Sequence, residues 1–159
     1  MRVLIRNTLR SVAATVLSLS CLTAAGEAFE RPQQDYILNC QGCHLADGSG
    51  SPGNVPRMKN FVGWYLHVPG GREYIMQVPG VANAPLGDAQ LAAVMNWVLQ
   101  RFSAAQLPKD FLPYSTEETG RLRADSIVDV VERRAELLER IRRQLGVTET
   151  AAAVAAGPP

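Results

Sequence analysis

The sequence predicts a small all-α protein, and three features support this prediction. Apolar residues recur every three or four positions within residues 88–103 and again within 127–145, which is the spacing of amphipathic helices. No run of useful length alternates between apolar and polar residues, so no strand is expected. Residues 45–57 are rich in Gly, Ser and Pro and predict a loop between helical segments. A chain of 159 residues can build one domain with additions, but not two full cores.

The first helix is expected to begin at Pro32, which suits a first helical position, and to run through residues 33–44. After the loop, residues 58–87 are interrupted by VPGG and VPGV and predict one short helix in each half. Asp88 is expected to cap the next helix. The apolar residues of that helix are Leu91, Val94, Met95, Val98, Leu99 and Phe102.

Beyond residue 103 the sequence predicts an addition to the domain. Residues 104–114 contain two prolines and are interpreted as a linker. Ser115 and Glu118 have the spacing of a capping box and predict the start of a C-terminal helical extension, residues 115–146. The amphipathic second half of this extension is either a strut packed on the domain or a docking helix for a partner. Residues 147–159 are expected to form a flexible tail.

The first 28 residues have the three parts of a secretory signal peptide, with cleavage after Ala25 or Ala28. Residues 1–10 carry three arginines and no acidic residue, and a short apolar run and small residues follow. The apolar run, about 15 residues, is too short to span a membrane comfortably. Cleavage would remove three arginines and Glu27, a net charge of +2, and so change the formal net charge from +1 to −1. We therefore expect a periplasmic protein that meets the membrane only through its cleaved signal peptide.

The stretch NCQGCH, residues 39–44, contains the C-x-x-C-H spacing of a c-type haem attachment site. Residues three apart lie on one face of a helix, so Cys40 and Cys43 can form thioethers with the two vinyl groups of one porphyrin. His44 follows directly and can ligate the iron from the same side. The sequence therefore predicts one covalently bound haem c.

Three other interpretations of this motif are weaker. A thioredoxin-like dithiol would need a strand-to-helix context, which the sequence lacks. A zinc site would need both cysteines and both histidines, and their spacing matches no usual zinc finger. A chance occurrence of the five residues is the third. The near-neutral charge also argues against a basic face for nucleic acid, so no nucleic-acid partner is expected.

Residues 29–103 are assigned to a domain that resembles the class I cytochrome c family. CHLADGSGSPGNVPRM, residues 43–58, is similar to the loop that follows the haem-attachment motif in that family. LGDAQLAAVMNWVLQRF, residues 86–102, is similar to its last helix. The resemblance implies a cytochrome c-like helical domain around one covalently bound haem c.

The resemblance also implies roles for individual residues. The carbonyl of Pro56 would accept the Nδ1–H of His44, and Met58 would pack against the haem. Trp97 of the last helix would cross the first helix. Its partners there would be Tyr36 and Ile37.

The sixth iron ligand is the point at which this sequence departs from the family. The family usually places a Met-Pro pair several residues before its last helix, and this sequence has Val78-Pro79 there. Met76 is the first choice for the ligand, with His67 as the alternative, and Met58 or no protein ligand at all also stay open. Methionine would raise the reduction potential and histidine would lower it.

The resemblance implies an electron carrier and not an enzyme, exchanging electrons with redox partners such as a periplasmic dehydrogenase or terminal oxidase. A five-coordinate haem protein, acting as a peroxidase or gas sensor, is one alternative. A haem-bearing subunit held in a larger dehydrogenase or oxidase complex is another. The chain has only two lysines, so we expect docking through apolar contacts with weak salt dependence.

Overall fold

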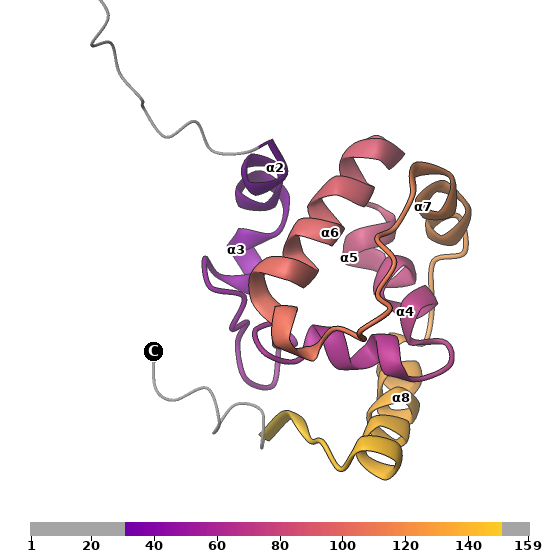
Figure 1. The fold of residues 1–159 in the computed structure, drawn as a ribbon. Helices are drawn as coiled ribbons and strands as arrows, with labels where there is room; N and C mark the ends of the chain where they lie inside the picture. Colours follow the sequence, from indigo (N-terminus) through magenta and orange to yellow (C-terminus); the bar gives the residue numbers. More distant parts are fainter. Residues whose placement is uncertain (1–30, 151–159) are drawn as a thin grey trace, which may run out of the picture.

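The computed structural model describes residues 31–150, and within them every regular element is helical (Figure 1). An isolated bridge between Ser51 and Val55 is the one pairing of extended backbone in this part of the chain. This confirms the all-α class. The predicted signal peptide and the last residues of the predicted tail lie outside the described residues. The elements are α2 (Arg31–Asn39), α3 (Gln41–His44), the 3-10 helix η1 (Val62–His67), α4 (Gly71–Gln77), α5 (Pro79–Ala82), α6 (Asp88–Ser103), the 3-10 helix η2 (Ala104–Gln106), α7 (Thr116–Arg123) and α8 (Val130–Leu145).

Helix α6 is the centre of the core and buries the apolar stripe expected from the sequence. Its buried apolar side chains include all six predicted residues. The prediction for the helix start was wrong by one position, because Gly87 is the N-cap and Asp88 is the first helical residue. The N–H of Gly87 donates to Oε1 of Gln90 (3.3 Å), and the Asp88 carboxylate instead accepts from Arg123.

Helix α2 crosses α6 through aromatic contacts. The ring of Tyr36 lies 5.3 Å from that of Trp97 and 5.2 Å from that of Phe102, centroid to centroid. The contact expected between Tyr36 and Trp97 is therefore present. The expectation for Ile37 was wrong, since its side chain is 38% exposed. One residue turns a helix by about 100°, so a helix that points Tyr36 at α6 turns Ile37 away.

The region between the loop and α6 forms three short helices, η1, α4 and α5, rather than the two expected. Gly71 begins α4 and lies directly against the backbone of Tyr65 in η1. A Cβ at this position would collide with the Tyr65 carbonyl oxygen. The glycine is thus what lets α4 turn back on η1.

Residues 107–145, here called the C-terminal arm, return along α6 and end in α7 and α8 (Figure 1). The segment interpreted as a linker is held against α6 by two hydrogen bonds between Asn96 and Tyr114. The Tyr114 N–H donates to Oδ1 of Asn96 (2.8 Å), and Nδ2 of Asn96 donates to the Tyr114 carbonyl (3.0 Å). The Tyr114 side chain is buried, so this part of the arm belongs to the domain core.

Helix α7 begins with half of the predicted capping box. Oγ of Ser115 accepts from the N–H of Glu118 (3.2 Å), as expected for an N-cap. The other half of the prediction was wrong, because the Glu118 carboxylate reaches Arg72 in α4 instead of the Ser115 backbone. The capping residue therefore starts the helix while Glu118 ties it to the domain.

Helix α8 packs against η1 and α4 through Leu137 and Ile141, which are fully buried. Nη1 of Arg140 also donates to the carbonyl of Pro69 (3.0 Å). Two other members of the predicted stripe, Val131 and Leu145, are exposed, so the contact face is narrower than the pattern indicated. These contacts pack α8 against the domain. None of the helices within residues 31–150 is long and apolar enough to cross a membrane.

Candidate haem-binding site

The two cysteines and the histidine of the C-x-x-C-H motif lie on a single helical turn. The N–H groups of Cys43 and His44 donate to the carbonyl of Cys40 at 3.2 and 3.0 Å. Neither cysteine is in a disulfide; Cys43 is exposed and Cys40 is partly buried. Burial, with a smaller effect of the Asp35 carboxylate, raises the pKa of the Cys40 thiol. Two reduced thiols on one turn fit thioether attachment to one porphyrin.

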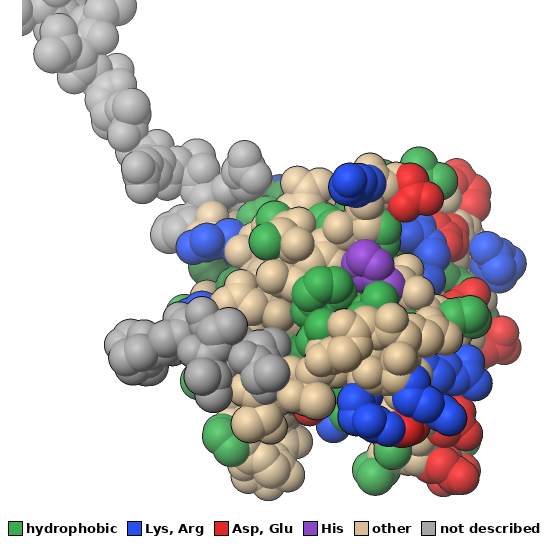
Figure 2. All heavy atoms as spheres, turned by 60° about the horizontal axis from the view of Figure 1, so that its bottom comes forward, with side chains coloured by type: hydrophobic (Ala, Val, Ile, Leu, Met, Phe, Trp, Pro, Cys, Tyr) green, Lys and Arg blue, Asp and Glu red, His purple; other side chains and the backbone are tan. Residues whose placement is uncertain are grey.

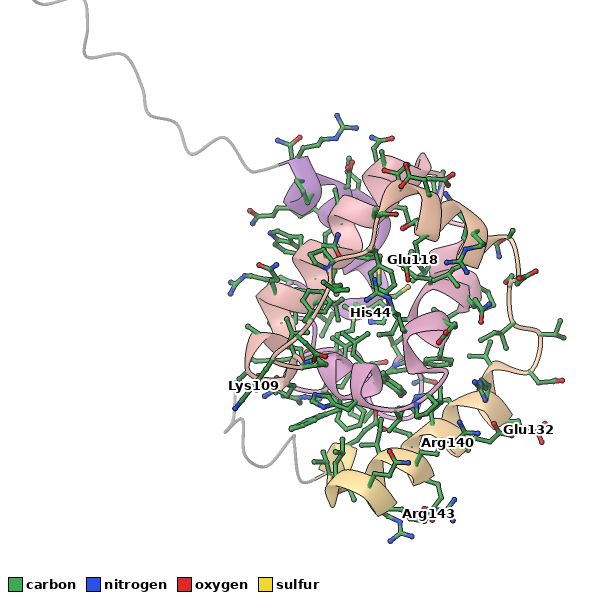
Figure 3. All side chains as sticks on the ribbon, turned by 45° about the vertical axis from the view of Figure 1, so that its right-hand side comes forward. His44, Lys109, Glu118, Glu132, Arg140 and Arg143 are labelled. Atoms are coloured by element: carbon green, nitrogen blue, oxygen red, sulfur yellow. The ribbon has the colours of Figure 1, made fainter. Side chains whose placement is uncertain are left out.

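His44 presents a partly buried imidazole whose Nδ1 atom is buried and has no hydrogen-bond partner among the described residues. Burial lowers the pKa of His44, and the nearby carbonyl of Pro56 acts in the opposite direction. When Nδ1 faces the Pro56 carbonyl, Nε2 is the ring nitrogen that can bind iron. Figure 3 shows His44 among the helices of the domain, whereas Arg143 lies at the outside on α8. A neutral imidazole in this position fits an iron ligand.

The loop after His44 folds back on the motif. The His44 carbonyl accepts from the N–H of Gly50 (3.1 Å), and the Gly48 carbonyl accepts from the N–H of Met58 (2.9 Å). Gly48 has φ +73°, and a Cβ there would lie 2.9 Å from the ring of Phe102 on α6. These contacts fold the segment that carries Pro56 and Met58 back toward the motif.

Leu45, directly after His44, is a feature that the sequence did not predict. Its φ of +63° lies in the left-handed region, which is unusual for a leucine. The hydroxyl of Tyr36 donates to its carbonyl at 2.6 Å and holds the strained residue in place. Local sequence could not signal this, because a leucine carries no preference for positive φ.

Met76 and His67, the two main candidates for the sixth ligand, lie in different surroundings. Met76 in α4 is fully buried in the hydrophobic core. His67 in η1 has its Nε2 atom 2.9 Å from the carbonyl of Gln106, and its ring lies 5.2 Å from that of Trp64. Because a carbonyl oxygen only accepts, Nε2 of His67 carries the proton in this contact and presents no lone pair to iron. The Met76 thioether lies among apolar core residues. Met58 is partly buried and packs against the core.

Known proteins provide an independent comparison. No family profile matches the chain. Cytochrome c-552 of Thermus thermophilus is 33% identical over 106 aligned residues, covering 55% of this chain and 81% of the relative. A second cytochrome c-552, from a specified strain of Thermus thermophilus, is also 33% identical over 106 residues, covering 72% of that relative. The chain therefore belongs to the class I monohaem c-type cytochromes, whose single haem c is bound covalently.

Proposed function

We propose that this protein is a periplasmic one-electron carrier with one haem c. The observation that carries the proposal is the helical turn of Cys40, Cys43 and His44, on which the two thiols form no disulfide and the His44 imidazole lies beside the Pro56 carbonyl. Similarity to cytochrome c-552 supports the same conclusion. The haem, when bound, supplies the ferric–ferrous couple.

In this proposal the chain's own residues hold and orient the cofactor. Cys40 and Cys43 form the thioethers, and His44 ligates the iron. The Pro56 carbonyl fixes the His44 ring through Nδ1, as partners of ligand imidazoles usually do. Met58 packs against the ring. Because the loop that carries Pro56 is hydrogen-bonded back to the motif, these groups can keep one geometry in both oxidation states.

Met76 is the proposed sixth ligand in preference to His67. A thioether in an apolar core suits a high-potential site, since methionine ligation and burial both disfavour the ferric state. The hydrogen bond between His67 and Gln106 would have to break before that imidazole could bind iron. A low-temperature magnetic resonance spectrum of the oxidised protein, recorded for Met76→Ala and His67→Ala beside the parent, tests the choice. We expect the low-spin ferric signal to change to a high-spin signal in Met76→Ala and to stay unchanged in His67→Ala. A change in His67→Ala alone would reverse the assignment.

The proposed partners are redox proteins such as a periplasmic dehydrogenase or a terminal oxidase, docked through apolar contacts. Acidic and basic side chains are interspersed on the face shown in Figure 2 rather than gathered by sign. On α8 they pair within the helix, as Arg142 does with Glu139 at 2.7 Å. The exposed apolar side chains Leu38 and Leu45 flank the C-x-x-C-H turn and would contact a partner near the haem. Electron exchange should therefore depend weakly on ionic strength.

A redox titration of the protein, matured in a host that attaches c-type haem, tests the function. We expect a reversible one-electron transition and no change in the reduced spectrum on addition of CO. Rapid CO binding by the reduced parent would instead support a five-coordinate haem. That alternative is considered because this sequence has Val78-Pro79 where the family has its Met-Pro pair.

A further inference from the structure

The C-terminal arm supplies hydrogen-bond donors to residues 72–88, here called the distal segment because the family resemblance places the sixth-ligand position within it. Arg123 at the end of α7 is the main donor, and its side chain is only 17% exposed. Its guanidinium also meets the Asp88 carboxylate at 3.1 Å. Its backbone acceptors are the carbonyls of Ala82 (2.9 Å), Ala84 (2.7 Å) and Leu86 (2.7 Å).

Two further donors of the arm reach the first half of the distal segment. The hydroxyl of Tyr114 donates to the carbonyl of Arg72 (2.7 Å), and the N–H of Ile127 donates to the carbonyl of Gln77 (2.9 Å). The Arg72 guanidinium in turn donates to both carboxylate oxygens of Glu118, each at 2.7 Å. Backbone carbonyls at five positions of the distal segment thus accept from the arm.

The close approach of α7 to the distal segment depends on a glycine. A Cβ on Gly120 would lie 2.6 Å from a carboxylate oxygen of Asp88. With no side chain there, α7 lies near enough for Arg123, three residues on, to reach the turn between α5 and α6. Within the segment the Ala84 carbonyl also accepts from the N–H of Leu86 (2.8 Å), so Arg123 adds its hydrogen bonds to an already folded turn.

We propose that Arg123 is a positioning residue for the haem site, holding the distal segment closed over the face of the haem opposite His44. This inference rests on the function proposed above and concerns the side of the site that lacks the family's Met-Pro pair. Arg123 contacts no iron ligand directly and acts through the backbone of residues 82–88. When its hydrogen bonds are lost, the segment opens more often and a foreign ligand reaches the iron more easily.

The proposal is tested by titrating the oxidised, haem-loaded protein with imidazole. Binding is monitored through the shift of the Soret absorption band. We expect Arg123→Gln to bind imidazole about tenfold more tightly than the parent, the equivalent of losing one or two net hydrogen bonds. Arg123→Lys, which keeps the charge but can satisfy fewer carbonyls, should fall between the two. The matched control is Arg142→Gln, because Arg142 also pairs with a carboxylate, but that carboxylate belongs to Glu139 on its own helix. It should stay within about twofold of the parent.

If the role of Arg123 is purely structural, Arg123→Gln will have a lower melting temperature but the same imidazole affinity as the parent. That result would overturn the proposal. If Arg123→Gln does not accumulate haem, Arg123→Lys decides in the same way: an affinity equal to that of the parent is the contradicting result. A parent without covalent haem would overturn the proposed function as well, whereas unchanged affinity in a haem-loaded variant would overturn this inference alone.

Discussion

Replacement of Leu137 by Ala tests whether α8 is an integral part of the domain. The Leu137 side chain is fully buried, one helical turn before the fully buried Ile141, against η1 and α4. Leu→Ala at such sites costs about 2–5 kcal/mol, because transfer energy is lost and a cavity remains. With a urea m value of about 2 kcal/mol/M, a loss of about 3 kcal/mol lowers the unfolding midpoint by about 1.5 M. Urea titrations of the haem-loaded protein, followed by circular dichroism, measure this shift.

The control for this experiment is Val131→Ala on the same helix. Val131 is 85% exposed, so its replacement should change the free energy of unfolding by less than about 0.5 kcal/mol. A midpoint for Leu137→Ala that matches that of Val131→Ala would refute the packing of α8 described above. If Leu137→Ala lowers the m value but leaves the midpoint of the main transition unchanged, α8 unfolds separately from the rest of the domain.

Three further predictions concern stability and attachment. Gly71→Ala should destabilise the protein by about 2 kcal/mol or more, because the new Cβ collides with the Tyr65 carbonyl. This holds even though alanine generally favours a helix more than glycine does. A raised melting temperature would contradict the prediction. Glu118→Gln should cost about 1 kcal/mol near neutral pH, a small value because the pair with Arg72 is partly exposed. Hydrogen bonding to Arg72 lowers the pKa of Glu118 below its ordinary value of 4.5. The parent should therefore be more stable than Glu118→Gln above pH 4.5, and this difference in the free energy of unfolding should disappear as the pH falls through the lowered pKa. A difference in stability that does not change with pH would contradict this prediction. Cys43→Ala should leave one thioether, visible as a shifted pyridine haemochrome band, and an unshifted band would exclude Cys43 as an attachment point.

The elements with a long apolar period were predictable from the sequence, and the short ones were not. Helix α6 spans four turns, so its stripe identified the core residues almost completely. The helices η1, α4 and α5 have seven residues or fewer, too few for a period to stand out. Their ends depend on contacts such as that between Gly71 and the Tyr65 backbone, which local sequence does not encode.

The candidate site was predicted from a motif because covalent haem attachment constrains neighbouring residues. Cys40, Cys43 and His44 are adjacent in the sequence, so the chemistry could be inferred without the fold. Arg123 could not be found in this way. Its partners are backbone carbonyls 37 to 41 positions earlier, and every residue type has a carbonyl, so no sequence pattern identifies them.

The central claim is that the chain carries one haem joined by two thioethers and ligated by His44. Mass spectrometry of the mature protein under denaturing conditions, combined with thiol titration, tests it most directly. We expect the mass of the processed chain plus one haem, with no thiol left to react and no haem extracted by acidified organic solvent. A mass equal to that of the chain alone, with both Cys40 and Cys43 still reactive, would contradict the account.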